Sequence, residues 1–189
     1  GPGNMVIDAV VSIVTGGELE FDEDGKIAAS GNVVRGLLDW ALSHPFFRKD
    51  PPKTTGREEF GMCFTKEIVE RAQAKGIGDS DLVATVTALT AESIVMSYER
   101  WVPPVCNLDQ VIIGGGGSYN RTLINMLRER LPGVEVIVHE DVGISSDAKE
   151  AIAFAILGND AAAGCFTNVP KATGARHGAT LGKIIPGRR

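Results

Sequence analysis

Four consecutive glycines are the residues in this sequence best suited to chemistry: Gly114, Gly115, Gly116 and Gly117. They follow a short apolar run, 111–113, that predicts the end of a buried strand. After Asn120 the apolar residues recur at helical spacing as far as Leu131. Such a turn lets a ligand lie against bare backbone, and the helix start offers unpaired N–H groups and a positive dipole end. The pattern favours a nucleotide-binding turn over a glycine linker, because linkers rarely join a β-branched strand to an amphipathic helix.

Glycine spacing distinguishes three kinds of nucleotide site. A P-loop does not fit, because the nearest candidate, 178–184, is one residue short and ends in isoleucine. A Rossmann fingerprint matches at its first two glycines, Gly114 and Gly116, but its third glycine would fall on Tyr119. In that interpretation Glu140 or Asp141 would be the acid that binds ribose. The adenosine-binding turn of the sugar kinase, Hsp70 and actin superfamily is a strand that runs into Gly-Gly-Gly-x-x-Asn. It fits residue for residue, with Asn120 opening the helix.

The composition excludes several classes of protein. The chain has 189 residues, of which 43% are hydrophobic and 23% charged, values typical of a globular protein. A net charge of −5 without a basic, aromatic cluster argues against a nucleic-acid partner. The most apolar window, 82–105, is interrupted by charged residues and so predicts no membrane span. The cysteines lack metal-ligand spacing, which predicts no metal site and a reducing, cytoplasmic compartment: Cys63, Cys106 and Cys165.

The order of expected elements predicts an α/β fold. Asn4 is expected to cap a first helix that ends at 16–17, and Thr65 to cap a short helix that runs to about 75. The segment 21–25 is expected to be a solvated turn. The remaining expected elements are helix 32–44, helix 80–101 ended by Pro103-Pro104, a strand ending at 113, a helix to 131, strand 134–138 and a closely packed, alanine-rich helix 147–157.

The ordered set of motifs resembles the anhydro-N-acetylmuramic acid kinases and their levoglucosan kinase relatives. Each motif is weak alone, but their order and spacing together span nearly the whole chain. They are Gly1-Pro2-Gly3-Asn4, Asp24-Gly25, Ala28-Ala29-Ser30-Gly31, Pro52-Lys53-Thr54-Thr55-Gly56-Arg57-Glu58, the glycine run with Asn120, Asp141-Val142-Gly143-Ile144, Asp147 to Glu150 with Ala151, Phe154 and Ala155, Thr173-Gly174-Ala175 and Leu181-Gly182.

The resemblance implies a lobe of the actin-like ATPase, sugar kinase and Hsp70 superfamily, with a ribonuclease H-like fold. Residues 1–189 would be the C-terminal lobe of a two-lobe kinase, incomplete at its N-terminus and without the N-terminal lobe. Such kinases open a 1,6-anhydro sugar and phosphorylate its 6-oxygen with ATP and Mg²⁺. The family's catalytic aspartate would lie two residues before Gly1, so we expect this chain to have no catalytic residue and no activity of its own. The expected partners are the anhydro sugar and ATP, and a homodimer is allowed.

The resemblance also assigns candidate substrate contacts. The segment Gly1, Pro2, Gly3 and Asn4 lies at a helix start and can present N–H groups to a phosphate or sugar oxygen, or Asn4 can simply cap the helix. Glu150 matches a glutamate that contacts the sugar, although most helix glutamates are solvated. Lys53 and Arg57 match a Lys-Ser-Thr-Gly-Arg-Glu segment, with Thr54 replacing serine. They either approach the nucleotide or sugar, or hold a loop through ion pairs.

Two other functions remain open at this stage. A non-catalytic module could keep a nucleotide or sugar surface without the chemistry, and a Rossmann oxidoreductase would bind a dinucleotide instead. Within the kinase family, the choice between anhydro-N-acetylmuramic acid and levoglucosan depends on contacts to the N-acetyl and lactyl groups.

Overall fold

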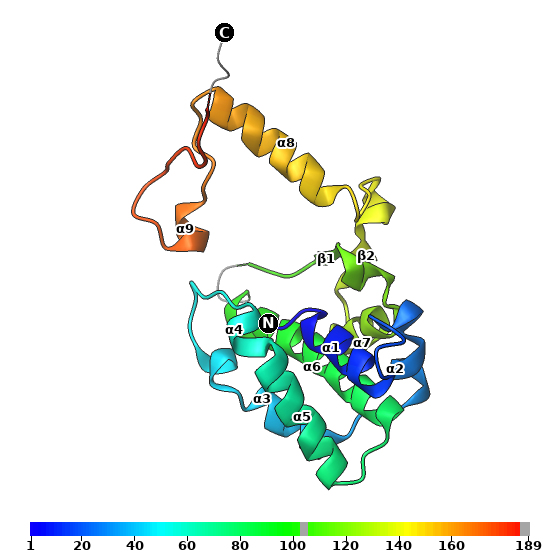
Figure 1. Cartoon of the computed structure of the whole chain (residues 1–189). Coiled ribbons are helices and arrows are strands. Elements are labelled where there is room, and N and C mark those ends of the chain that lie inside the picture. Colours follow the sequence, from blue (N-terminus) through cyan, green and yellow to red (C-terminus); the bar gives the residue numbers. More distant parts are fainter. Residues whose placement is uncertain (103–105, 186–189) are drawn as a thin grey trace. The chain divides into compact units, whose positions relative to one another are not determined.

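The long helix α6 (Asp79–Trp101) organises the first of two structural units (Figure 1). The computed structural model describes residues 1–102 and 106–185. One unit comprises 1–49 and 55–146, and the other comprises 50–54 and the residues from 147 onward. The helix was expected over 80–101, so this prediction is confirmed. Pro103-Pro104, expected to end it, lies outside the described residues.

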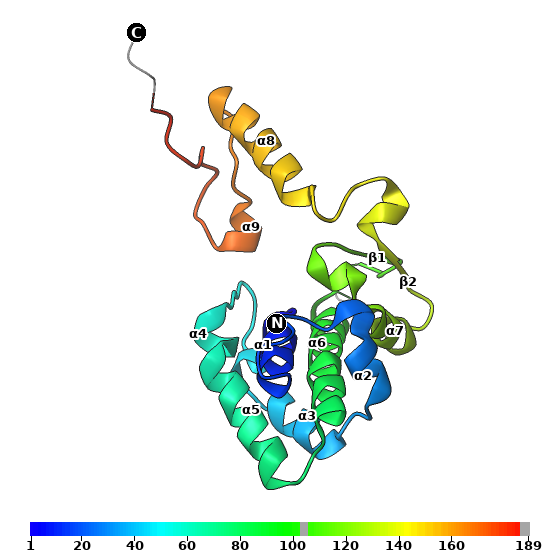
Figure 2. The same ribbon diagram turned by 45° about the vertical axis from the view of Figure 1, so that its right-hand side comes forward.

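Four helices of the first unit pack against α6, and Figure 2 shows α1 (Met5–Val14), α2 (Lys26–Ser30) and α3 (Arg35–Leu42) grouped near it. The fourth is α7 (Arg121–Arg130). Every residue of α6 from 82 to 91 is buried, so the helix contacts neighbours on all its faces. This explains why the residues there are apolar apart from three threonines, Thr85, Thr87 and Thr90, whose hydroxyls donate to backbone carbonyls.

A two-stranded parallel sheet completes the first unit. Strands β1 (Gln110–Ile113) and β2 (Glu135–Val138) pair in the register Gln110↔Glu135 to Ile113↔Val138, and α7 connects them. A hydrophobic cluster joins this sheet to α7 and the end of α6: Ala91, Val95, Val111, Leu123, Ile124, Leu127, Leu131 and Val136. The mixture of helices and a small parallel sheet agrees with the predicted α/β class, and both strands and the helix between them are confirmed.

Two predicted helix starts were wrong, one because distant side chains bind the segment before the helix and the other because a neighbouring carbonyl binds the expected cap residue. Helix α3 begins at Arg35 rather than 32, since the N–H of Asn32 donates to the Asp81 carboxylate (2.7 Å) and that of Val34 to the Thr85 hydroxyl (2.9 Å). Helix α5 (Met62–Ala74) begins three residues before Thr65. Thr65 is buried inside it and donates its hydroxyl to the Gly61 carbonyl at 3.1 Å, so it is not a cap.

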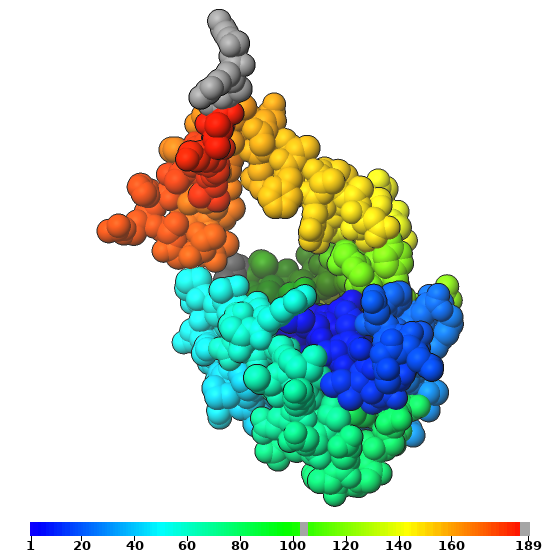
Figure 3. All heavy atoms as spheres, in the orientation of Figure 1, coloured from blue at the N-terminus to red at the C-terminus, as the bar shows by residue number. Residues whose placement is uncertain are grey.

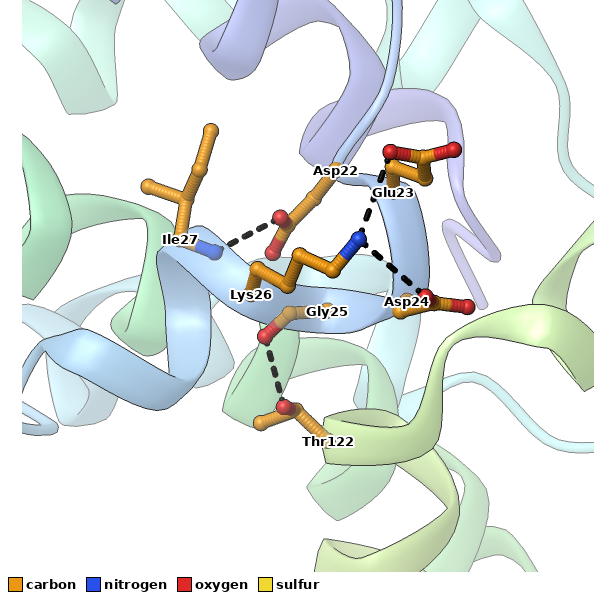
Figure 4. A network of polar contacts seen from close by, with 7 residues as sticks. All are labelled: Asp22, Glu23, Asp24, Gly25, Lys26, Ile27 and Thr122. Carbon is orange, nitrogen blue, oxygen red and sulfur yellow. Dashed lines mark hydrogen bonds and ion pairs between the residues drawn. The ribbon is translucent and has the colours of Figure 1, made fainter.

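The segment 21–25 is a turn, as expected, and Phe21, Glu23 and Asp24 are exposed, but it is not solvated throughout, because Asp22 and Gly25 are buried. It contains the 3₁₀ turn Glu23–Gly25, and Asp22 is only 4% exposed. The Asp22 carboxylate accepts hydrogen bonds from the N–H groups of Ile27 (2.8 Å) and Ala28 (2.9 Å), as Figure 4 shows for Ile27. Because Gly25 occupies the cap position of α2 and has no side chain, Asp22 satisfies the first N–H groups of that helix.

The second unit contains α8 (Lys149–Ala162) and α9 (Pro170–Thr173). Helix α8 is longer than predicted, and none of its side chains is buried, so the expected close packing of its alanines is wrong in the described structure. The segment after α8 is held by Asn168, which accepts from the N–H of Ala179 (2.7 Å) and donates to the carbonyl of His177 (3.1 Å). The remaining short elements of the chain are 3₁₀ turns Pro45–Arg48, Gly116–Tyr119 and His139–Val142, and helix α4 (Arg57–Phe60).

Candidate functional site

The glycine run lies where the sequence predicted it, between β1 and α7. Gly115 has a φ of +77°, which glycine adopts without strain, and no atom lies within 4 Å of the position a Cβ would take there. A short 3₁₀ turn then leads to Asn120, whose side chain accepts a hydrogen bond from the N–H of Leu123 at 2.9 Å. The prediction that Asn120 opens the helix is therefore confirmed. The open side of Gly115 leaves bare backbone accessible to a ligand.

Gly114 has a different reason to be glycine. A Cβ at this position would overlap the imidazole ring of His139, which stands at the end of β2. Close packing of the two strand ends therefore requires Gly114, independently of any ligand. No pattern in the sequence indicated this contact, because it joins residues that follow two different strands.

The N-terminal segment is fixed against α6. The hydroxyl of Thr90 donates to the Gly3 carbonyl at 2.7 Å, and a Cβ at Gly1 would lie 2.6 Å from the Ser93 hydroxyl. Pro2 is buried, and its carbonyl accepts from the N–H of Met5 at 3.3 Å. Small residues at this point let the segment approach the helix closely.

Asn4 brings the N-terminal segment and the glycine run together. Its side chain makes no capping hydrogen bond to α1, so the simple capping interpretation is wrong, although α1 does begin directly after it. Its amide instead lies against the glycines: a Cβ at Gly117 would be 3.1 Å from Asn4 Oδ1, and one at Gly116 would be 3.5 Å from Asn4 Nδ2. Two of the predicted binding segments, far apart in sequence, therefore meet in one place.

A polar network fixes the start of α7 relative to α2 (Figure 4). The hydroxyl of Thr122 donates to the carbonyl of Gly25 at 2.7 Å, and a larger residue at Gly25 would collide with Asn120 and Thr122. Lys26 pairs with Glu23 and Asp24 on the exposed side of the same turn. The Asp24-Gly25 motif thus supports the helix start beside the glycine run, a role that sequence reasoning missed.

Both acids proposed as ribose ligands in the Rossmann alternative are used inside their own loop. The Glu140 carboxylate accepts from the N–H of Ser146 (2.8 Å) and its hydroxyl (3.0 Å), and the backbone hydrogen bond from Ser146 lowers the pKa of Glu140. Asp141 accepts from the N–H of Val138 at 2.9 Å. These bonds, and Tyr119 in place of the third glycine, weigh against a dinucleotide site.

Arg57 lines a pocket with residues of α1. The pocket has a volume of about 420 Å³, and its lining includes Met5, Asp8, Ala9, Arg57, Gly61 and Met62. Burial raises the pKa of Asp8 to about 6. Within the described residues, neither the Asp8 carboxyl nor the Arg57 guanidinium has a hydrogen bond or ion pair. The expectation that Arg57 holds a loop through ion pairs is therefore not met, and sequence reasoning had not connected it to Asp8.

The other two predicted contacts belong to the second unit. Lys53 lies in its short segment 50–54, where it is partly buried, and Glu150 is an exposed residue in the first turn of α8.

In the described part of the chain, no cluster of three or more histidine, cysteine or acidic residues could hold a metal ion. The Mg²⁺ that the kinase resemblance implies is compatible with these residues, because Mg²⁺ binds largely through water and nucleotide phosphates and needs few protein ligands. No helix among the described residues is long and apolar enough to span a membrane.

Comparison with known proteins identifies the family. The chain matches the family profile "Anhydro-N-acetylmuramic acid kinase" over residues 1–187. The chain belongs to this family. An anhydro-N-acetylmuramic acid kinase of Caldanaerobacter subterraneus subsp. tengcongensis is 52% identical over 184 residues, covering 97% of this chain and 46% of that protein. One of Bacillus cereus (strain AH820) is 46% identical over 186 residues, covering 97% and 48%.

The chain therefore spans about half the length of the curated relatives it matches. Membership of the anhydro-N-acetylmuramic acid kinase family supports a sugar kinase and confirms the family resemblance seen in the motifs. It also argues against the Rossmann oxidoreductase alternative.

Proposed function

We propose that the whole protein to which this chain belongs is an ATP-dependent kinase of 1,6-anhydro-N-acetylmuramic acid, with levoglucosan as the second candidate substrate. The observation that carries the proposal is the meeting of Asn4 with Gly116 and Gly117, in a chain that matches the family over residues 1–187. A kinase must hold the sugar and the phosphoryl donor side by side. The resemblance assigns the segment from Gly1 to Asn4 to the sugar and the glycine run to the nucleotide.

In the proposed reaction, water attacks the anomeric carbon and a carboxylate takes its proton. The bond from that carbon to the bridging oxygen breaks, and the freed 6-oxygen attacks the γ-phosphate of ATP, with ADP as the leaving group. The glycine run would hold the adenosine through Gly114, Gly115, Gly116, Gly117 and Asn120, while Glu150 and the segment from Gly1 to Asn4 would contact the sugar. The carboxylate is proposed to be the family's aspartate, two residues before Gly1.

The same resemblance underlies several further proposals. We propose a C-terminal lobe of the actin-like ATPase and sugar kinase superfamily, a cytoplasmic location and use of Mg²⁺ with ATP. The proposal also allows the whole protein to form a homodimer. Residues 1–189 alone are proposed to be inactive, because phosphoryl transfer needs donors on both sides of the transferred group. A non-catalytic sugar- or nucleotide-binding module is the alternative.

The test uses the whole protein and its Gly116→Val variant. Wild type should convert 1,6-anhydro-N-acetylmuramic acid and ATP to a sugar 6-phosphate, measured by mass spectrometry. Gly116→Val should weaken ATP binding by at least about tenfold, since its methyl groups would extend beyond a Cβ that is already 3.5 Å from Asn4 Nδ2 and crowd the space where the glycine run meets the N-terminal segment. Gly36→Val is the matched control, because a Cβ there meets no atom within 4 Å. Wild type that binds ATP and the sugar without turnover would support the non-catalytic module, and tight ATP binding by folded Gly116→Val would refute the turn assignment.

A further inference from the structure

The loop that follows β2, residues 139–146, is hydrogen-bonded to the glycine run. The hydroxyl of Ser118, in the 3₁₀ turn Gly116–Tyr119, donates to the hydroxyl of Ser146 at 3.0 Å. The two serines are 28 residues apart in the sequence, and Ser146 is buried. In Figure 3 the light-green surface around the glycine run borders the yellow surface of this loop. The contact joins the candidate nucleotide turn to a segment outside it.

Glu140 sets the direction of these hydrogen bonds. Its carboxylate accepts from the N–H of Ser146 at 2.8 Å and from the Ser146 hydroxyl at 3.0 Å. Because a hydroxyl has one hydrogen, Ser146 offers Ser118 only a lone pair, and Ser118 must be the donor. Bonds to a carboxylate are stronger than neutral ones, and bonds in a chain strengthen one another. The ionised Glu140 therefore holds Ser118 through Ser146.

Ser118 in turn holds the peptide of Gly115, the glycine with open space at its Cβ position. The Gly115 carbonyl accepts from the Ser118 N–H at 2.9 Å, and the Ser118 hydroxyl lies 2.8 Å from the same oxygen. This hydroxyl has one hydrogen and two possible acceptors, Gly115 and Ser146. The bond to Ser146 fixes it in one orientation and ties the turn to the loop.

The other end of the loop also contacts the glycine run. His139 begins the loop, and its imidazole ring packs so closely on Gly114 that a Cβ there would overlap it. The loop therefore holds the run at Gly114 and again directly after Gly117. Glycine has more backbone freedom to lose than any other residue, so a run of four needs such support to stay in one conformation.

We propose that loop 139–146 positions the glycine run, and that Glu140, acting through Ser146 and Ser118, holds the run in the conformation that binds the nucleotide. The inference rests on the proposed function and adds three residues to that site. Glu140 is a positioning residue and touches no reacting atom. Order imposed on the run before binding reduces the entropy lost on binding, and so increases nucleotide affinity.

The experiment uses the whole protein with Ser146→Ala, Ser118→Ala and Glu140→Ala. Each variant should weaken ATP binding, measured by calorimetry, by about three- to tenfold, the effect of one hydrogen bond. Turnover at saturating ATP should stay within about twofold of wild type, because the loss falls on binding and not on the chemical step. The control is Glu129→Ala, an exposed carboxylate on α7, which should change neither value.

A double substitution tests whether the three residues act as one chain. Glu140→Ala combined with Ser118→Ala should weaken ATP binding no more than the larger single effect, since either change already breaks the chain. Additive losses, unchanged ATP affinity, or variants that lose turnover at saturating ATP would overturn the inference. Glu140 is exposed, so Glu140→Ala keeps the test available if a change at the buried Ser146 prevents folding.

Hydrogen exchange of the free protein separates this inference from the proposed function. Amides 114–118 should exchange at least about threefold faster in the three variants than in wild type, and at the wild-type rate in Glu129→Ala. Unchanged exchange refutes the positioning role even in a protein that binds ATP and phosphorylates the sugar. Faster exchange in variants of a wild type that does not bind ATP supports the positioning role and refutes the kinase function.

Discussion

Replacing Gly114 by alanine should destabilise the protein through a single contact. The new Cβ would overlap ring atoms of His139, whereas carbon atoms pack at about 3.5–4.0 Å, so the ring or the strand ends must shift by about 1 Å or more. Overpacking of this kind costs about 1–3 kcal/mol. With a typical urea dependence of about 2 kcal/mol per M, the unfolding midpoint should fall by about 0.5–1.5 M.

Intrinsic fluorescence is a suitable assay, because both tryptophans, Trp40 and Trp101, lie in the first unit. The control is Gly36→Ala, at an exposed helical position with open space around its Cβ, which should raise stability by up to about 1 kcal/mol. Adding His139→Ala to Gly114→Ala should recover part of the loss, since the clashing ring is gone. A wild-type midpoint for Gly114→Ala, or strict additivity of the two substitutions, would refute the steric argument.

Three further substitutions test separate parts of the structure. Asp22→Ala should lower the free energy of unfolding by about 1–2 kcal/mol, measured in urea, because two N–H groups of α2 lose their acceptor; an unchanged midpoint would contradict the capping role. Burial raises the pKa of Asp8 from 3.8 to about 6, so the folded state binds its proton more tightly and stability should fall as the pH rises through that interval. Asp8→Asn should remove this part of the pH dependence in urea titrations between pH 4 and 7, and a parallel profile would count against it. Glu150→Gln in the whole protein should reduce sugar turnover far more than ATP affinity, and unchanged kinetics would return Glu150 to the role of a solvated helix residue.

Local sequence patterns predicted the elements whose causes are local. Helix α6, both strands and the Asn120 cap depend on periodicity or on a side chain three residues from its partner, and the structure confirms them. The start of α3 could not be found in this way. It depends on Asp81 and Thr85, about fifty residues along the chain, which bind the N–H groups of the segment before it.

The candidate site shows the same difference between local and long-range causes. The glycine run and the N-terminal segment were visible as motifs, but their contact through Asn4 joins residues that are far apart in the sequence. Asp8 sits on α1 beside residues that face the core, and nothing in the spacing of that helix indicates that Arg57 will line the same pocket. Pairing of residues across the fold, rather than the identity of the residues, was the missing information.

The glycine run itself shows how one motif can combine requirements of folding and of binding. Gly114 makes room for His139, while Gly116 and Gly117 lie against the Asn4 amide. Gly115 alone among them combines a positive φ with open space at the Cβ position, so it is the place where a ligand can approach the backbone unobstructed. A loss of activity on substitution therefore has a different meaning at each position. At Gly114 it should follow the loss of stability, and at Gly116 it should follow the loss of nucleotide affinity in a protein that remains folded.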